Sequence, residues 1–297
     1  MDDTPLAPPA ELNFVGTDNF AWVGQHFFDI FVRDGGLKPH HRVLDVGCGV
    51  GRMALPLTAY LAPPGGYEGI DIVDAGIDWC RANITPRFPH FRFRQADVYN
   101  GTYHPAGRYD ARDYRFPYPT GSFDFAFLTS VFSHMLPADL ENYLAEVARV
   151  LKVGGRCVIT FFLRTPEAVR HCATGKPWMA FEHPLPGCWV ANPASFEDAV
   201  AYEEPYVLGL YERLGLTPDG GVRYGSWSGR PDPYSGQDVL IATKTRHARP
   251  PAVVQLKRLV RRVRARWFPP ARQTRPVSSL GGDVVRAREF SRGERAA

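Results

Sequence analysis

The spacing of apolar and polar residues predicts alternating strands and helices between residues 43 and 244. Apolar runs of the length typical of strands lie at residues 43–47, 67–72, 91–98, 123–130, 156–162 and 237–244. The run at 91–98 alternates apolar with polar residues, whereas the nearly continuous run at 123–130 predicts a strand buried on both faces. Strands that alternate with helices favour an α/β fold with a mainly parallel sheet.

Helical spacing is clearest just before the fifth of these strands. One apolar stripe there contains Leu140, Tyr143, Leu144, Val147 and Leu151. Asp139 and Glu141 begin this segment and Lys152 lies near its end, so we expect the glycines at 154 and 155 to terminate the helix. Further helices are predicted at 20–34, 51–61, 75–83 and 205–214. The proline at position 56 must lie in the first turn of the helix at 51–61 or bend that helix.

The domain organisation follows from where this regular pattern weakens. We expect one domain over residues 1–247, with a helical cap at 1–40 and a substrate-side insertion at 165–235. A polar, tyrosine-rich insert at 100–122 separates the third and fourth strands, and long connections of this kind often border an active site. The aromatic residues of the insert, with Trp178, Trp189 and Trp227, can stack on a sugar or another ring, and packing of a lid explains them equally well.

Charge separates the chain into an acidic body and a basic end. Residues 244–297 contain 15 Lys and Arg against 3 Asp and Glu, a net charge of +12, which leaves 20 basic and 28 acidic residues, a net charge of −8, for residues 1–243. Apolar residues at helical spacing within 252–268 are surrounded by lysine and arginine, so residues 248–297 are predicted to be a basic amphipathic helix and a disordered tail. Such a helix suits an anionic membrane surface. Nucleic acid is a less favoured partner, and an extension without a specific role is the competing interpretation.

The overall composition excludes several classes of protein. Hydrophobic residues make up 44% and charged residues 22% of the chain, as in ordinary globular domains. Five cysteines without CxxC spacing argue against a zinc site or a disulfide framework, so no metal is expected. The N-terminal stretch has no signal-peptide pattern and no apolar run is long enough for a membrane span. We therefore expect a cytoplasmic protein, with peripheral contact at the inner membrane surface through 252–268 as a further hypothesis.

Candidate chemistry begins at VLDVGCGVGRM, where an apolar strand runs into three glycines (Gly47, Gly49 and Gly51). A dinucleotide-binding turn requires G-x-G-x-x-G, but the position of its third glycine is Arg52. No G-K-[ST] follows, which excludes a Walker A phosphate loop. The turn is therefore suited to a ligand without a pyrophosphate, such as a nucleoside that carries an amino-acid group.

Two carboxylates downstream support a nucleoside site. Asp71 ends the second strand, where one carboxylate can accept both hydroxyls of a ribose. Asp97 ends the third strand and can accept a hydrogen bond from an adenine amine. Either aspartate taken alone is explained as well by capping of the next helix or turn, but a glycine turn and two strand-end acids in register predict a nucleoside site.

These motifs resemble those of the class I S-adenosylmethionine-dependent methyltransferases. VLDVGCGVGR is similar to the first motif of that family, and EGIDI, QADV and FDFAFLTSVFSHM are similar to later ones. The resemblance covers residues 41–162 and the last strand, and it implies a Rossmann-like, doubly wound sheet of seven strands whose last strand is antiparallel. It also implies S-adenosyl-L-methionine as cofactor, held by Asp45, Gly47, Cys48, Gly49, Gly51, Asp71, Ile72, Asp97, Val98 and Thr129.

The methyl acceptor and the base are less constrained by the sequence. No [ND]-P-P-[YF] element follows the fourth strand, which argues against exocyclic amines of nucleobases, and no cysteine lies there for attack on a pyrimidine. With these acceptors argued against, a hydroxyl of a small molecule or glycan is favoured as the methyl acceptor. His134 is the first candidate for a general base, with backbone hydrogen bonding as the competing role, and His171, Glu182 and His183 are weaker candidates.

Two other functions remain open at this stage. A nicotinamide-dependent oxidoreductase uses a related fold, but the arginine at position 52 argues against the dinucleotide. A non-catalytic, membrane-tethered module that retains the fold would explain the basic end of the chain.

Overall fold

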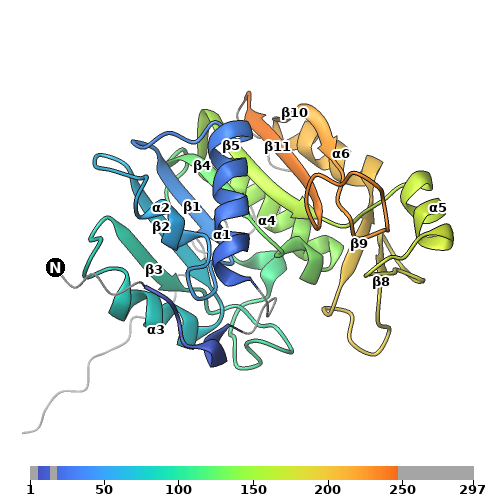
Figure 1. Cartoon of the computed structure of the whole chain (residues 1–297), viewed down its shortest axis with the longest axis horizontal. Coiled ribbons are helices and arrows are strands. Elements are labelled where there is room, and N and C mark those ends of the chain that lie inside the picture. The colour runs from blue at the N-terminus through green and yellow to red at the C-terminus, as the bar shows by residue number, and fades with distance from the viewer. Residues whose placement is uncertain (1–5, 14–18, 247–297) are drawn as a thin grey trace, which may run out of the picture. The chain divides into compact units, whose positions relative to one another are not determined.

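A seven-stranded sheet forms the centre of the computed structural model, which describes residues 6–13 and 19–246 (Figure 1). The strand order is β3-β2-β1-β4-β5-β11-β10, and β11 runs antiparallel to both of its neighbours while the other pairs are parallel. Its strands are β1 (Arg42–Val46), β2 (Gly66–Asp71), β3 (Phe91–Gln95), β4 (Phe123–Leu128), β5 (Leu151–Phe161), β10 (Leu216–Arg223) and β11 (Asp238–Lys244). The predicted doubly wound, seven-stranded sheet is confirmed. The predicted basic helix at 252–268 and the tail that follows lie outside the described residues.

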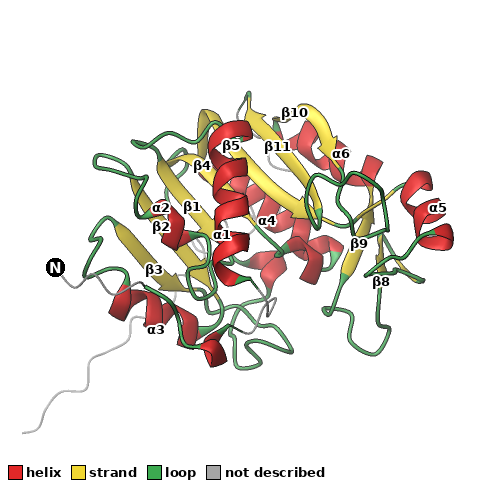
Figure 2. Cartoon of the chain, in the orientation of Figure 1, coloured by secondary structure: helices red, strands yellow, loops and turns green. Residues whose placement is uncertain are grey.

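Helices cover both faces of this sheet (Figure 2). The helices are α1 (Phe20–Asp29), α2 (Ala54–Leu57), α3 (Asp74–Asn83), α4 (Pro137–Val150), α5 (Pro166–Thr174) and α6 (Glu204–Leu214). Side chains alternate across a strand, so Val43 packs in one core with α1, α2 and α3, whereas Leu44 packs in the other with α4 and α6. A π-helical turn (Ile30–Asp34) extends α1, and Gly215 ends α6 in the left-handed conformation, as predicted. The helix predicted at 51–61 is reduced to the four residues of α2.

The end of α4 differs from the prediction. The helix stops at Val150 and the chain passes directly into β5, so Lys152 and Gly154 lie in the strand segment and do not cap the helix. The register between β4 and β5 shifts after the pair Phe123 and Leu151, and Gly154 turns the chain there with a φ of +85°. The glycines therefore allow an irregular start of the strand. In the sequence, glycines at the start of a strand and glycines at the end of a helix give the same pattern.

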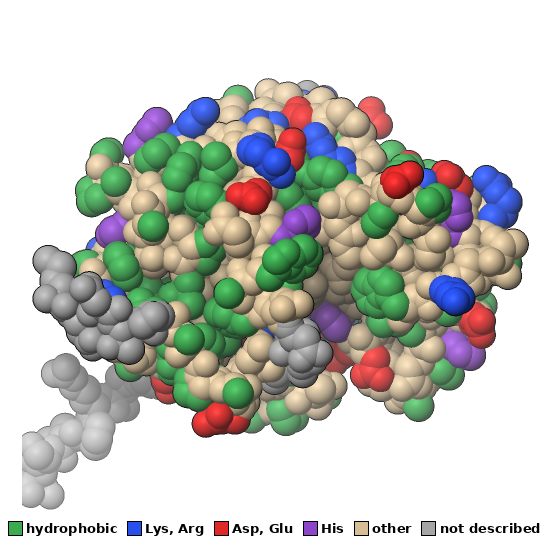
Figure 3. All heavy atoms as spheres, in the orientation of Figure 1, with side chains coloured by type: hydrophobic (Ala, Val, Ile, Leu, Met, Phe, Trp, Pro, Cys, Tyr) green, Lys and Arg blue, Asp and Glu red, His purple; other side chains and the backbone are tan. Residues whose placement is uncertain are grey.

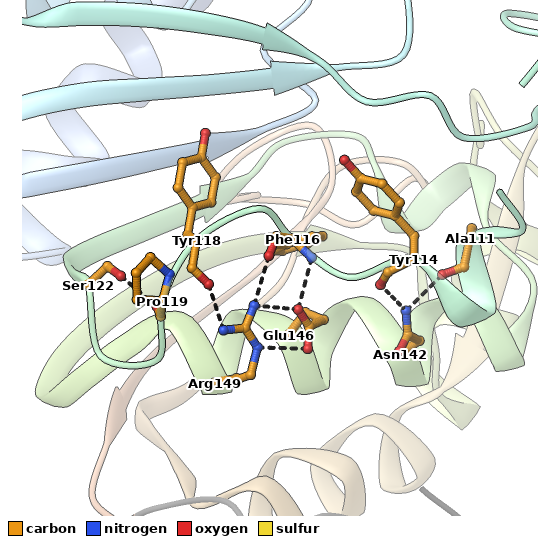
Figure 4. A network of polar contacts seen from close by, with 9 residues as sticks. All are labelled: Ala111, Tyr114, Phe116, Tyr118, Pro119, Ser122, Asn142, Glu146 and Arg149. Carbon is orange, nitrogen blue, oxygen red and sulfur yellow. Dashed lines mark hydrogen bonds and ion pairs between the residues drawn. The ribbon is translucent and has the colours of Figure 1, made fainter. Parts of the chain in front are cut away.

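Polar side chains of α4 fix the second half of the tyrosine-rich insert (Figure 4). Glu146 is buried, accepts the backbone N–H of Phe116 at 2.9 Å and forms an ion pair with Arg149 at 2.6 Å. Arg149 also donates to the backbone oxygens of Phe116 and Tyr118. One helical turn earlier, Asn142 donates to the backbone oxygens of Ala111 and Tyr114, both at 2.8 Å. Residues 111–118 are therefore held against the domain, and Figure 4 shows the tyrosine rings pointing away from α4.

The region predicted as an irregular insertion contains a second, four-stranded sheet. Its order is β6-β9-β8-β7, with β6 (Leu163–Arg164), β7 (His183–Leu185), β8 (Cys188–Val190) and β9 (Val200–Glu203). A small core of its own includes the buried Phe162, Phe181 and Trp227. Strands of two to four residues carry too little periodicity to be recognised from sequence. Within 6–13 and 19–246, no helix is both long and apolar enough to cross a membrane.

Candidate functional site

A cavity of about 460 Å³ opens where the parallel strands end, beside the point at which the strand order reverses between β1 and β4. This edge is where open α/β sheets bind their ligands, and the volume is that of a small-molecule site. Figure 3 shows the surface hollowed between the part that carries α1 and the part that carries β8 and β9. Eight of the predicted site residues line the cavity: Gly47, Cys48, Gly49, Asp71, Ile72, Val98, Thr129 and His134.

The glycine turn presents backbone rather than side chains to this cavity. Gly47 has a φ of +82°, and a Cβ atom there would lie 2.4 Å from Cγ2 of Val131, so only glycine fits. Gly49 has a φ of +52° and no atom lies within 4 Å of the place a Cβ would take. A ligand can therefore approach the main chain closely at Gly49. Gly51 does not line the cavity, because it faces Ile84 and Cys80.

Asp71 connects this turn to the second strand. Its carboxylate accepts the backbone N–H of Gly49 at 2.7 Å and that of Val73 at 2.9 Å, one on each oxygen. Burial raises the pKa of the Asp71 carboxyl, and the N–H donors oppose that shift. A carboxylate offers about four acceptor positions, so the backbone donors leave capacity for a hydroxyl group in the cavity. Asp71 thus lies at the cavity, and its contact with a ribose stays a prediction.

Arg52, in place of the third dinucleotide glycine, also lines the cavity. Its guanidinium donates to Oδ1 of Asn13 at 2.6 Å and lies over the ring of Phe20, 5.4 Å from the centroid. The arginine therefore ties the N-terminal segment and the start of α1 to the glycine turn. A glycine there would remove this connection.

Two predicted acids do not reach the cavity. Asp45 is fully buried on the face of β1 that carries Val43, where it accepts the hydroxyl of Tyr67 at 2.5 Å, and burial raises the pKa of its carboxyl well above the usual range. Asp97 forms an ion pair with Arg108 and accepts the Arg108 backbone N–H at 3.1 Å. The Arg108 guanidinium lowers the pKa of the Asp97 carboxyl. The neighbours of Asp97, Ala96 and Val98, line the cavity instead.

His134 lies in a 3-10 turn (Phe132–His134) that follows β4. Its Nδ1 is 2.8 Å from the backbone oxygen of Glu197. A carbonyl oxygen only accepts, so Nδ1 carries the proton and the neutral ring keeps a lone pair on Nε2. The backbone contact that was the competing interpretation for His134 is therefore present, and it leaves Nε2 available to act on a ligand.

Sequence reasoning missed several cavity residues that come from distant segments. Glu197, in the loop before β9, lines the cavity and accepts the backbone N–H of Gly101 at 3.1 Å through its carboxylate. Arg112 lines the cavity from the tyrosine-rich insert, together with Tyr103, one of the insert's aromatic residues that were candidates for ring stacking. The length of that insert was the available signal for Arg112, whereas nothing near position 197 marks a site.

The other candidates lie elsewhere. The cavity lining does not include His171, Glu182 or His183, nor any of the three tryptophans considered for ring stacking. Trp227 is buried and donates to Asp238 at 2.8 Å, which makes it part of the core. Cys48 does line the cavity, but its side chain is buried, burial raises the pKa of its thiol, and its sulfur packs toward Gly69. In the part of the chain that the structure describes, no group of three or more His, Cys, Asp or Glu is placed to hold a metal ion.

Known proteins share this domain. A family model described as a methyltransferase domain matches residues 44–159. A demethylmenaquinone methyltransferase of Deinococcus radiodurans is 31% identical over 171 residues, which are 55% of this chain and 62% of that protein. An enzyme of the same name from Thermus thermophilus is 31% identical over 130 residues, 44% of this chain and 51% of the relative. The matches thus span less than two thirds of either relative.

Solved structures show the same fold. The PH0226 protein of Pyrococcus horikoshii aligns with a TM-score of 0.54 at 16% identity, over 80% of this chain and 96% of that one. The likeness extends beyond the strands that carry the motifs.

Proposed function

Because the chain carries a class I S-adenosylmethionine-dependent methyltransferase domain, we propose that it methylates a hydroxyl-bearing small molecule or glycan bound beside His134. The main observation that supports this proposal is that the open glycine turn after β1 lies beside Asp71 at the end of β2. Gly49 leaves space for close approach to the main chain, and Asp71 keeps acceptor capacity for a diol. Together they fit a nucleoside that carries an amino-acid group.

S-adenosylmethionine supplies, when bound, a methyl group already activated by its sulfonium. The protein then has to bind and orient two molecules and accept one proton. Asp71 is the residue for the ribose, and the Gly47–Gly49 main chain is placed for the methionine part. Ile72 and Val98 supply apolar walls of the cavity, and Thr129, the residue after β4, also lines it. Asp45 acts only indirectly, by supporting β1 beneath the turn, and Asp97 acts by holding Arg108.

His134 is the residue that we assign to the proton. With Nδ1–H held by the Glu197 backbone, Nε2 can take the proton of an acceptor hydroxyl as the oxygen becomes nucleophilic. Aliphatic hydroxyls need such a base more than phenols do, because their protons are less acidic. The hydrogen bond to the Glu197 backbone favours the tautomer that this role requires, which supports the proposal.

A second acceptor is favoured by the relatives. Both are named for demethylmenaquinone, and a hydroxylated ring that loses its proton carries negative charge on the oxygen and on adjacent ring carbons. The same histidine would then serve methylation at carbon. We retain the hydroxyl oxygen as the first proposal and a ring carbon of a quinol as the second.

Binding of the cofactor can be tested without an acceptor. We expect S-adenosylhomocysteine to raise the melting temperature of the purified protein and NADH to leave it unchanged, since a ligand stabilises the state that binds it. Stabilisation by NADH alone would replace the methyltransferase proposal with an oxidoreductase. Stabilisation by neither would favour a non-catalytic module.

Transfer can be tested with S-adenosylmethionine that carries a CD3 methyl group. Phenols, 1,4-dihydroxynaphthalene and simple glycosides are offered as acceptors, and NMR of the product distinguishes methyl on oxygen from methyl on carbon. His134→Gln should lower kcat about 100-fold or more. His183→Gln, at an exposed histidine outside the cavity, is the matched control. An unchanged kcat in His134→Gln would exclude His134 as the base.

A further inference from the structure

A second cavity of about 310 Å³ adjoins the first on its outer side. Its walls come from the start of the tyrosine-rich insert, through Tyr99 and Thr102, and from the loop before β9, through Phe196. Tyr99, Leu136 and Glu197 line both cavities, so the two spaces are neighbours. We call the second space the outer pocket.

The walls of the outer pocket are fixed by hydrogen bonds that do not involve a ligand. The Glu197 carboxylate joins the two segments by accepting the Gly101 N–H at 3.1 Å. Oδ1 of Asn100 accepts the N–H groups of Thr102 and Tyr103, at 3.0 and 2.8 Å, which shapes the insert side. Asp198 accepts the Ser195 hydroxyl at 2.6 Å and shapes the other side. The outer pocket is thus preformed, which lowers the entropy lost when a ligand is bound.

Two large hydrophobic side chains of its wall are exposed to solvent. Phe196 is 42% exposed and Tyr99 is 49% exposed, although both are large hydrophobic residues. Exposed rings gathered around a concavity are typical of a ligand groove rather than of an ordinary surface. Covering them with a ligand would remove apolar area from water.

Charge limits the kind of group that can bind there. Among the described residues that line the outer pocket, Glu197 is the single charged one. The inner cavity is lined by Asp71, Asp110, Asp139 and Glu197 against Arg52 and Arg112, so acids outnumber bases there too. A phosphate or carboxylate on the acceptor would lie near these carboxylates. An uncharged group avoids that repulsion.

We propose that the outer pocket is a second subsite for the methyl acceptor, which binds an uncharged apolar group, a ring or alkyl chain, attached to the part that reacts beside His134. The inference rests on the proposed function for the place of the reacting end. It adds that acceptors are extended molecules with an apolar, non-anionic distal portion.

The test uses 4-alkylphenols with ethyl, butyl and hexyl chains as probes. Their binding to the full-length protein saturated with S-adenosylhomocysteine is measured by isothermal titration calorimetry. We expect the affinity to rise at least tenfold from ethyl to hexyl, which is about 1.4 kcal/mol. Phe196→Ala should remove most of this gain, and Thr102→Trp, which fills the outer pocket from an exposed position, should abolish it. Val169→Ala, at an exposed apolar residue of α5, should leave the gain intact.

The outcomes separate this inference from the proposed function. Failure of S-adenosylhomocysteine to bind would refute the methyltransferase proposal itself. Binding of S-adenosylhomocysteine without a gain in affinity along the probe series, including no binding of any phenol, would refute the subsite alone. A gain that persists in both Phe196→Ala and Thr102→Trp would place the apolar group elsewhere and overturn the inference.

Discussion

Replacement of Asp71 by asparagine tests the centre of the proposed site with a change of one atom. Each carboxylate oxygen already accepts one backbone N–H, from Gly49 or from Val73. Asparagine has a single oxygen, so its NH2 group must face one of these N–H donors. The substitution therefore disturbs the glycine turn and removes acceptor positions for a ribose at the same time.

The expected magnitude follows from the hydrogen bonds that the substitution removes. A hydrogen bond to a charged acceptor contributes about 1.5–3 kcal/mol. Asparagine removes at least one bond to the ribose and weakens the other by removing the charge, so we expect binding to weaken by about 3 kcal/mol. That difference corresponds to a roughly 100-fold higher Kd for S-adenosylhomocysteine.

Isothermal titration calorimetry at pH 7.5 measures this Kd, and circular dichroism verifies that the variant is folded. Asp74→Asn removes the same charge three residues further along. The Asp74 carboxylate is exposed and accepts the N–H of Ala75 at 2.7 Å, so the control should bind within about twofold of the wild type. If folded Asp71→Asn binds within threefold of the wild type, the assignment of Asp71 to the cofactor is refuted.

Two further predictions concern the turn and the core. Gly47→Ala should lower the free energy of unfolding in urea by about 1–3 kcal/mol and abolish cofactor binding, because φ is +82° and the new Cβ would lie 2.4 Å from Val131. Gly121→Ala is the control, because φ is +69° there but no atom lies within 4 Å of the new Cβ, so only the smaller backbone effect is expected. Burial raises the pKa of the Asp238 carboxyl from 3.8 to about 6, so the folded state binds the proton more tightly than the unfolded chain. The free energy of unfolding should therefore fall by up to about 3 kcal/mol as the pH rises from about 4 to about 6, and urea unfolding of Asp238→Asn should not show this fall. A free energy of unfolding that does not change with pH in the wild type would contradict the raised pKa.

The strands of the large sheet were predictable because their residues carry the pattern themselves. The run at 123–130 is buried on both faces, and its apolar character is almost uninterrupted. β10 was missed because Pro218, Gly220 and Gly221 interrupt it, and such residues are tolerated only because β10 is an edge strand. Position in a sheet is a property of the tertiary structure, so local propensity does not reveal it.

The site was predictable where backbone geometry determines the side chain. Gly47, Gly49 and Asp71 lie where strand ends and a turn must place them. Asp97 follows the end of β3, so strand geometry does not determine its direction, and its carboxylate pairs with Arg108. Glu197 was missed because its proximity to His134 depends on a contact across 63 residues.

The attachment of the tyrosine-rich insert to α4 has a consequence for how the domain opens. The Phe116 amide is bound by the buried Glu146, so its exchange with solvent hydrogen requires α4 itself to come away from the sheet. Residues 99–104 are held differently, by the bridge between Asn100 and His104 and by the Gly101 N–H, which the Glu197 carboxylate accepts at 3.1 Å. Release of this segment requires the Gly101–Glu197 hydrogen bond to break, but it does not require α4 to leave the sheet. We therefore expect hydrogen exchange at residues 99–104 to be faster than at Phe116, and access to the cavity to depend on the first segment rather than on the second.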